Sequence, residues 1–572
     1  MSADIDPTEA IPQVTAEMIA RAAARQAPPS EREAAAAPAT PQRTAPQRTA
    51  PERPAPERSV PQPPAPEPPA PQPPAPQPPA PTPTRATDRP VAEQPAAPDA
   101  VLSSRPGSSP FVPSEPYGDR HTSAGHIAAG HLSSLVQIPT VSVWDPQYLD
   151  HESFARHRAA LATFYPRVHA LQSEPAGDHG LLYRWPGRGR QDVLHPYPVV
   201  LMAHQDVAPV RFADWPGNPF SGEIRDGVVH GRGTLDDKGA LVAVLDAVET
   251  LLGEGFVPER DIWLFFGADE ETTGDSAQTA VRRLYELGVR PWLVLDEGGS
   301  VATDVFPGLD RRTALVGVAE KGLVGINLYT TDVGGHASTP GRWTATTRLS
   351  RAVTRVGRHR FAARVSAPTA EMLGKVAPGA TGTKGATLRA VTRLAAGPLR
   401  KLAAWMLAGG GPEAAATVRT TVSVTELEGS PGANVAAATA RARLDVRVAL
   451  GDTVDKTVAR LRHVIRDKKV EIEVVESTEP SEVSPTDSQQ FALLGEAVGA
   501  AYPDALVVPY VTPSATDARR FTPISDHVYR FSPFVMTREQ RQSAHGSGEH
   551  LSVDSLSRGV HFYREVLRKI PG

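Results

Sequence analysis

Short apolar runs that end in histidine or acidic residues most constrain what this chain can fold into. Val199–Ala203 precedes His204, and Ile262–Gly267 precedes an Asp-Glu-Glu triplet at 269–271. A third run ends at Asp296. Short apolar runs of this kind are typical of buried strands, and α/β sheets build their sites where strand ends meet loops. The pattern predicts an α/β fold with its polar motifs at one edge of a sheet.

Strands alternate with helices through this part of the chain. The expected strands are Pro198–Ala203, Asp261–Gly267 and Pro291–Leu295. Ala240–Gly253 is expected to form a helix, because its leucines and valines recur with helical spacing. Alternation of this kind predicts a largely parallel sheet.

The pattern changes from about Lys321. Leu323–Tyr329, Val422–Leu427 and Ala440–Ala449 alternate like half-exposed strands. Expected helices lie between them at 344–356 and 399–407. A Gly-, Ala- and Thr-rich stretch at 368–384 is predicted to be a mobile loop. These features predict an α+β insert within the α/β domain.

The first 118 residues are rich in proline, with near-copies of a short repeat between Pro63 and Thr82. Such repeats favour extended polyproline II structure and bury no core, so we expect a disordered tail with a possible short helix at Thr15–Arg25. The tail is either a passive spacer or a docking site for a proline-binding partner. The predicted division is a tail (1–118), a catalytic domain in two parts (119–320 and 451–572) and the insert (321–450).

Composition limits the partners and the compartment. The net charge of −4 offers no bulk attraction for nucleic acid or an anionic membrane, so neither is expected as a partner. The chain has no cysteine, which excludes disulfides, thiolate metal sites and cysteine nucleophiles. The start of the chain has no signal-peptide pattern, and no apolar run is long enough for a membrane span. The expected location is the cytoplasm.

The motifs carry ligand chemistry. His204 can bind a metal ion, and Asp206, on the same side of the strand, can accept the other N–H of the imidazole. Asp236 lies in a glycine-flanked loop and can bridge two ions. The neighbours Glu270 and Glu271 can divide proton transfer and metal binding between them. Carboxylates that outnumber imidazoles suit a pair of divalent metals, zinc first.

Taken in order, these segments resemble the dizinc exopeptidase and amidohydrolase family that includes aminoacylase, carboxypeptidase S, carnosinase and succinyl-diaminopimelate desuccinylase. The resemblance covers about residues 121 to 570. The Gly-Gly-Ser after Glu297, the Ala-Glu-Lys-Gly stretch at 319–322 and the Gly-Gly-His-Ala-Ser stretch at 334–338 are most similar to the carboxypeptidase S branch. It implies a zinc-exopeptidase-like catalytic domain, two zinc ions per chain, and a lid or dimerisation domain formed by the insert.

The resemblance also implies roles for single residues. His204 would bind one zinc, and Asp236 would bridge both zincs and be followed by a cis peptide bond. Glu270 would be the general base, with Glu271 a ligand of the second zinc. The remaining implied ligands are the acid after the third apolar run, either Glu297 or Asp296, and His545 in the motif Ala-His-Gly-Ser-Gly-Glu-His at 544–550.

Residues of the insert would complete the site. The resemblance implies that His336 reaches the active site of a second subunit and polarises the scissile carbonyl, which requires a homodimer. Asn434 and Arg447 would hold the substrate carboxylate, since an arginine fork binds a carboxylate bidentately. Arg519 is the expected substrate contact on a further loop.

The predicted activity is zinc-dependent hydrolysis of an amide or peptide bond next to a free carboxylate, as in a carboxypeptidase or dipeptidase. An alternative within the enzyme class is an N-acyl amino acid amidohydrolase that can also condense its products. An alternative of another class is an inactive scaffold that recruits partners through its proline-rich tail.

Overall fold

The computed structural model describes residues 119–189 and 193–572. The predicted tail and its possible helix at Thr15–Arg25 lie outside the described residues. Among the described residues, no helix combines the length and the apolar character needed to cross a bilayer.

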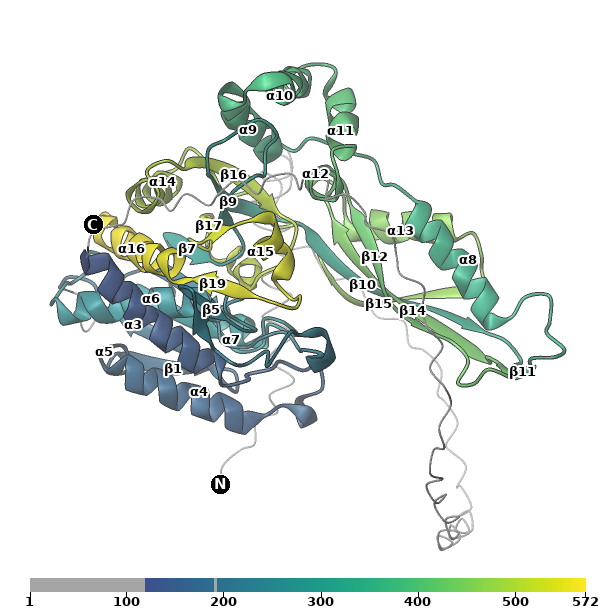
Figure 1. Cartoon of the computed structure of the whole chain (residues 1–572), viewed down its shortest axis with the longest axis horizontal. Helices are drawn as coiled ribbons and strands as arrows, with labels where there is room; N and C mark the ends of the chain where they lie inside the picture. The colour runs from purple at the N-terminus through teal and green to yellow at the C-terminus, as the bar shows by residue number, and fades with distance from the viewer. Residues whose placement is uncertain (1–118, 190–192) are drawn as a thin grey trace, which may run out of the picture. The chain divides into compact units, whose positions relative to one another are not determined.

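A ten-stranded sheet forms the centre of the catalytic domain, in the order β1-β2-β6-β3-β7-β17-β9-β8-β18 with β16 beside β9 (Figure 1). Its strands are β1 (Gln172–Ala176), β2 (Gly180–Trp185), β3 (Val199–His204), β6 (Ile262–Gly267), β7 (Leu293–Asp296), β8 (Ser300–Ala302), β9 (Thr313–Glu320), β16 (Leu506–Thr512), β17 (Val528–Arg530) and β18 (Val535–Met536). The strands β3, β6 and β7 are buried along their whole length, which explains their continuous apolar runs.

The direction of the strands is mixed. The central strands β6, β3, β7 and β17 run parallel, as the sequence predicts. At both sides the pairing turns antiparallel, between β1, β2 and β6 and between β17, β9 and β8. The reason is visible at β8 and β9, which are joined by a short connection without a crossover helix and therefore pair antiparallel.

Helices cover this sheet. They are α3 (Asp119–Val136), α4 (His151–Phe164), α5 (Pro166–His169), α6 (Lys238–Gly253), α7 (Asp275–Glu286), α14 (Gln489–Ala501), α15 (Arg538–Ser543) and α16 (Val553–Lys569), with the 3-10 turns η1 (Pro146–Tyr148), η2 (Phe212–Asp214) and η4 (Asp517–Phe521). The predicted helix at 240–253 is α6, which packs beside α3 and α16 (Figure 1). Leu132, Val244 and Phe562 from these three helices belong to the hydrophobic core that also includes residues of β3.

A small three-stranded sheet lies beside the large one. It consists of β4 (Ile224–Arg225), β5 (Val228–His230) and β19 (His550–Ser552). The antiparallel pairing of β19 with β5 ties the His545 loop to the loop that carries Asp236, although the two are far apart in sequence.

The insert forms a four-stranded antiparallel sheet, the lid sheet, in the order β12-β14-β10-β15. Its elements are β10 (Gly322–Thr331), β12 (Thr421–Glu428), β14 (Thr439–Val448) and β15 (Val470–Thr478), the short pair β11 (Gly335–His336) and β13 (Val435–Ala436), and the helices α8 (Ala345–Arg358) and α13 (Val454–Ile465). Alternate residues of β14 are buried against the two helices. The predicted strands of the insert are therefore present.

The end of the insert differs from the sequence prediction. Residues 451–572 were assigned to the second part of the catalytic domain, but β15 pairs with β10 in the lid sheet. Helix α13 packs in the same core, through Val458 and Leu461. In sequence, a helix followed by a strand is identical to an α/β unit, so the pattern alone could not reveal which sheet this strand joins.

The stretch at 368–384 is a further correction, because it is not a loop. It forms most of α9 (Ala367–Val376), the turn η3 (Ala377–Gly379) and the start of α10 (Gly382–Ala395), followed by α11 (Arg400–Ala408) and α12 (Pro412–Val418). Met372 and Leu373 pack against Leu315 and Val508 of the large sheet. This tertiary burial stabilises a helix in a segment whose glycine and threonine content argues against one.

Candidate functional site

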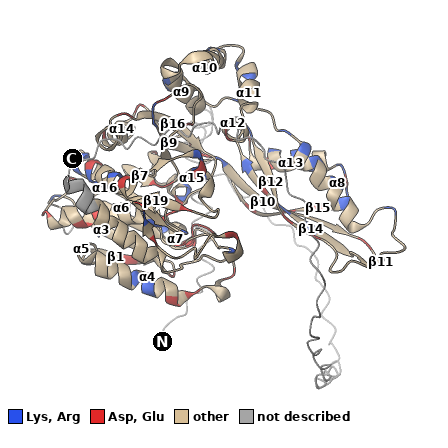
Figure 2. Cartoon of the chain, in the orientation of Figure 1, with Lys and Arg blue, Asp and Glu red and all other residues tan. Residues whose placement is uncertain are grey.

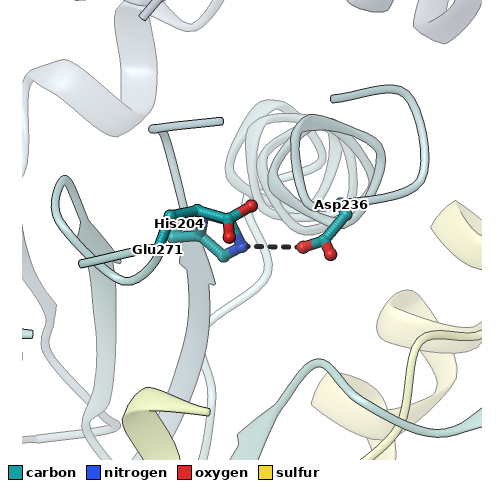
Figure 3. A group of neighbouring side chains, drawn as sticks. All are labelled: His204, Asp236 and Glu271. Atoms are coloured by element: carbon teal, nitrogen blue, oxygen red, sulfur yellow. Dashed lines mark hydrogen bonds and ion pairs between the residues drawn. The ribbon is translucent and has the colours of Figure 1, made fainter. Parts of the chain in front are cut away.

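The carboxyl ends of three parallel strands bring the acidic and histidine motifs together. Strand β3 lies between β6 and β7. His204 ends β3, Asp296 ends β7, and Glu270 and Glu271 follow β6. Figure 3 shows His204, Asp236 and Glu271 as neighbours, with a hydrogen bond between His204 and Asp236. The ligand atoms of the three residues lie within 4.8 Å of one another.

Asp236 lies between two histidines. Its Oδ1 is 3.0 Å from Nε2 of His204, and its Oδ2 is 3.1 Å from Nε2 of His545. The peptide bond between Asp236 and Asp237 is cis, as the family resemblance implies. Each oxygen of one carboxylate thus faces a different imidazole, which is the arrangement a bridging ligand needs.

Glu271 completes the second half of the cluster. Its Oε2 is 3.0 Å from Nε2 of His545, which is also the nitrogen that faces Asp236. Its Oε1 is buried and has no hydrogen-bond partner within the described residues. A buried carboxylate oxygen without a donor is costly unless a cation or another donor satisfies it, so the geometry fits a bound metal ion.

The histidines of this cluster carry protons when no metal is bound. Hydrogen bonds to Asp236 and Glu271 raise the pKa of His545 to about 11. Burial alone would lower the pKa of His204, but its hydrogen bonds to Asp206 and Asp236 raise it well above its usual value. Metal binding needs neutral imidazoles, so it must release these protons, and metal affinity should fall as the pH falls.

The loop around His545 is held in an uncommon backbone conformation. His545 has a φ of 60°, in the left-handed region, and is followed closely by glycines at 546 and 548. Non-glycine residues in this region occur where the surrounding structure imposes them, often at functional sites.

Glu270 lies beside the cluster without a fixed side-chain partner among the described residues. Burial raises the pKa of Glu270 well above its usual value, against the opposing effect of His204, and the neighbouring Asp517 and Glu271 raise it further. A carboxyl group with a raised pKa near a metal cluster suits a group that takes up and releases a proton.

Asp296 and Glu297, which the sequence could not distinguish, have different surroundings. The Oδ2 of Asp296 accepts a hydrogen bond of 2.8 Å from the backbone N–H of Ala518, and burial raises its pKa to about 6. Glu297 is half-buried, and burial together with Asp236 and Asp237 raises its pKa well above its usual value. The carboxylate of Asp296 thus anchors a neighbouring loop, and the assignment of Glu297 as the ligand stays a prediction.

Asp206 orients the residues around it. It is fully buried, and its carboxylate accepts hydrogen bonds from the backbone N–H groups of Glu270 (3.3 Å) and Glu271 (3.1 Å). Its Oδ1 is also 3.3 Å from Nδ1 of His204. A single carboxylate thus sets both the imidazole and the loop with the two glutamates, so Asp206 is a positioning residue.

Sequence reasoning missed a buried ion pair that supports Asp236. The carboxylate of Glu549 accepts a hydrogen bond of 2.5 Å from the guanidinium of Arg232, and both side chains are buried. It also accepts hydrogen bonds from the backbone N–H groups of Leu235 (2.8 Å) and Asp236 (3.2 Å). Glu549 lies in the motif that contains His545, so the same segment supplies a cluster residue and the support of its neighbour. No local pattern identifies this pairing, because its partners are more than 300 residues apart.

The structure does not bring the lid residues into the cluster of the same chain. His336 is exposed, and its Nδ1 hydrogen-bonds with Ser338. Asn434 lies next to it, with its carbonyl accepting from Ala337 at 3.0 Å. Arg447 lies at the other end of β14, where it forms a bidentate ion pair with Asp445.

Arg519 has structural partners instead of a position in the cluster. Its guanidinium is bound to Glu320, at 2.9 and 3.2 Å, and to the hydroxyl of Thr478. Glu320 also pairs with the fully buried Arg530. These contacts involve all three nitrogens of Arg519, and its role as a substrate contact stays a prediction.

Comparison with known proteins identifies the family. Residues 200–569 match the model of Peptidase family M20/M25/M40. A probable carboxypeptidase S-like 2 of Dictyostelium discoideum is 32% identical over 457 residues, which cover 77% of this chain and 84% of that protein. An N-fatty-acyl-amino acid synthase/hydrolase PM20D1 of Xenopus tropicalis is 31% identical over 451 residues, covering 76% and 84%.

Solved structures show the same fold at lower identity. An M20 family metallo-carboxypeptidase, Sso-CP2 of Sulfolobus solfataricus, superposes with a TM-score of 0.58 at 17% identity and covers 77% of this chain and 98% of that one. Human carnosine dipeptidase 1 gives a TM-score of 0.57 at 15% identity, covering 78% and 98%. The family model, the two relatives and the shared fold agree: this chain belongs to peptidase family M20/M25/M40 and is a hydrolase that acts on C–N bonds.

Proposed function

We propose that the chain hydrolyses an amide or peptide bond next to a free carboxylate, with two zinc ions held by the cluster. The observation that carries the proposal is the Asp236 carboxylate, whose two oxygens face His204 and His545 separately. His204 and Glu297 would hold one ion, and His545 and Glu271 the other, with Asp236 shared. Imidazole and carboxylate donors in this ratio suit zinc.

The chain's own residues divide the remaining work. Bound zinc lowers the pKa of water and polarises a carbonyl oxygen. Glu270 takes a proton from the attacking water and delivers it to the leaving amine. Asp206 holds the backbone of Glu270 and the ring of His204, which keeps the base and the cluster in register.

The proposed leading substrates are peptides, as for a carboxypeptidase or dipeptidase. The name of the Dictyostelium relative and the carboxypeptidase and dipeptidase structures support this choice. N-acyl amino acids are the second candidate, because several relatives are named N-fatty-acyl-amino acid synthase/hydrolase. Both classes place an amide next to a carboxylate, so one site chemistry serves either.

Hydrolysis should depend on bound metal, and a comparison of hydrolysis rates should identify the substrate class. Purified protein incubated with dipeptides and with N-acyl amino acids of several chain lengths should release amino acids from one class at least tenfold faster. A strong chelator should abolish this release, because every proposed step needs the ions, and added zinc should restore it. Amino-acid release and metal content per chain are the measurements. Protein without metal or turnover after zinc addition would favour the inactive scaffold instead.

We also propose that the lid forms a homodimer in which His336 and Asn434 act on the other subunit's substrate. Strands β10 and β14 pair along their length, with Leu323 opposite Arg447 at one end and Thr331 opposite Thr439 at the other. These two ends are eight residues apart along each strand. That length of antiparallel strand spans about 27 Å, so His336 and Arg447 of one chain lie at opposite ends of the lid sheet. They can serve one substrate only if two chains contribute.

Two inactive variants should restore each other if the site is shared. His336→Ala and Glu270→Gln should each be nearly inactive alone. In a mixed dimer, one site combines Glu270 from the first chain with His336 from the second, so random mixing should recover roughly a quarter of wild-type activity. The measurement is activity after the two proteins are mixed under conditions that exchange subunits. Asp206→Ala mixed with Glu270→Gln is the control and should recover nothing, since both residues belong to the same half-site. No recovery in the first mixture would remove His336 from its role in the other subunit.

The proline-binding partner of the tail and the cytoplasmic location stay predictions from the sequence.

A further inference from the structure

Helix α11 and the residue before it expose three large apolar side chains, whereas two alanines of the helix are buried. Leu399, Leu402 and Trp405 are 54%, 44% and 70% exposed, whereas Ala403 and Ala404 are fully buried. A spacing of three residues places the exposed side chains on one face of the helix. Surface helices of soluble domains present polar residues on this face. The arrangement in α11 is therefore the reverse of the usual one.

The exposed face is not an incomplete core. Helix α10 packs against α11. Leu388 of α10 and Leu407 of α11 contribute to the core that holds this part of the insert on the large sheet. The two helices are thus anchored by their inner faces, and the outer apolar face is left uncovered by the described residues of the chain.

Positive charge surrounds this face. The segment that comprises α10, the connecting turn and α11, here called the basic hairpin (residues 382–408), contains five Lys and Arg residues and no Asp or Glu. Figure 2 shows blue but no red on α10 and α11. The whole chain has a net charge of −4, so the charge of the basic hairpin is opposite in sign to that of the whole chain.

Most of these cations are available to a partner. Lys384, Arg393, Arg400 and Lys401 are exposed, and none forms an ion pair with an acid in residues 119–189 or 193–572. Elsewhere in the insert, by contrast, Arg364 pairs with Asp452 at 2.7 Å. Arg400 and Lys401 begin α11 directly after Leu399, so charge and apolar surface are contiguous.

We propose that the basic hairpin docks the protein on the surface of an anionic lipid bilayer. An apolar stripe flanked by Lys and Arg is the pattern of helices that lie in the bilayer interface, where tryptophan also places its amphipathic ring. Anionic headgroups complement unpaired cations near such a stripe. The attachment is peripheral and reversible, because it uses a single helix face. The overall negative charge of the chain predicted no membrane partner. A bilayer that binds this surface would contact only the basic hairpin, whose local charge is positive.

Vesicle binding by the full chain tests the proposal. The protein should co-float with vesicles of phosphatidylcholine and phosphatidylglycerol at low salt, and at least tenfold less with vesicles of phosphatidylcholine alone. Salt should release it, because the Debye length shortens from about 30 Å at 0.01 M to about 3 Å at 1 M. Trp405→Ala, and separately the double variant Arg400→Glu with Lys401→Glu, should each weaken binding at least tenfold.

Matched control variants distinguish binding through this surface from nonspecific binding to vesicles. Trp144 is 62% exposed in the catalytic domain, so Trp144→Ala removes a comparable side chain and should bind like wild type. Arg156→Glu with Arg158→Glu changes the net charge by the same amount on α4 and should also bind normally. Brominated lipid should quench tryptophan fluorescence in the wild type and in Trp144→Ala but much less in Trp405→Ala. Unchanged thermal unfolding of each variant shows that the fold is kept.

Three results would overturn the proposal. They are absence of binding to anionic vesicles at low salt, equal binding by wild type and Trp405→Ala, and equal binding to neutral and anionic vesicles. If the hairpin variants instead dissociate an oligomer in sedimentation and leave vesicle binding unchanged, the face binds a second copy of the chain, and the membrane assignment is wrong.

Discussion

Replacing Glu270 with glutamine should lower kcat by about 10²–10⁴-fold and leave the metal content unchanged. The amide keeps the size of the side chain but cannot take a proton from water. The backbone N–H of residue 270, which donates to Asp206, is retained, so the loop should keep its position. Steady-state kinetics on the preferred substrate, together with metal analysis of the same sample, measures both expectations.

The neighbouring glutamate provides the control. Glu271 faces His545 at 3.0 Å and has a buried oxygen without a partner, so Glu271→Gln should lose bound metal as well as activity. Two adjacent substitutions of the same type should therefore differ in metal content. Normal turnover by Glu270→Gln would show that another group is the base, and metal loss in that variant would show that Glu270 is a ligand.

Replacing Glu549 with alanine should destabilise the metal-free protein by about 3–5 kcal/mol, the range for breaking a buried ion pair. The change leaves the buried guanidinium of Arg232 without its carboxylate and removes the acceptor of the Leu235 and Asp236 N–H groups. Because Asp236 would hold both proposed ions, zinc affinity should also fall. Urea unfolding in chelator measures the free energy of unfolding, and zinc titration measures the affinity.

Two comparisons make this prediction specific. Glu496→Ala removes an exposed partner of Lys569 and should change the free energy of unfolding by about 0–1 kcal/mol. The double variant Arg232→Met with Glu549→Leu should recover part of the lost stability, because an apolar pair of similar volume leaves no buried charge. Similar stabilities for Glu549→Ala and Glu496→Ala would show that the Arg232–Glu549 pair contributes little.

The cluster was accessible from sequence because its residues lie at the ends of apolar strands. Buried parallel strands leave continuous apolar runs, and the residue after each run must lie at the carboxyl edge of the sheet, so His204 and Glu271 could be placed near each other without a structure. Asp296 and Glu297 follow the same run, and local pattern could not separate them. Their difference comes from the N–H of Ala518, more than 200 residues away.

Residues whose roles depend on long-range partners were not accessible in this way. Arg519 was predicted to contact substrate, but its guanidinium binds Glu320, which lies 199 residues earlier. Strand β15 was assigned to the catalytic domain, but hydrogen bonds to β10 place it in the lid sheet. In both cases the sequence shows a residue type or a strand, and the pairing is a property of the folded chain.

From the sequence alone we could predict the α/β class, the strand-end cluster of histidines and carboxylates, and the presence of an inserted second sheet. Periodicity and residue chemistry are local properties of the sequence, so they can be recognised without knowledge of the fold. The folded structure was needed to show where the lid ends, which ion pairs support the cluster, and that Leu402 and Trp405 of α11 face outward. The reason is that burial and pairing depend on which distant segments meet, and an apolar stripe looks the same in sequence whether it covers a core or faces solvent.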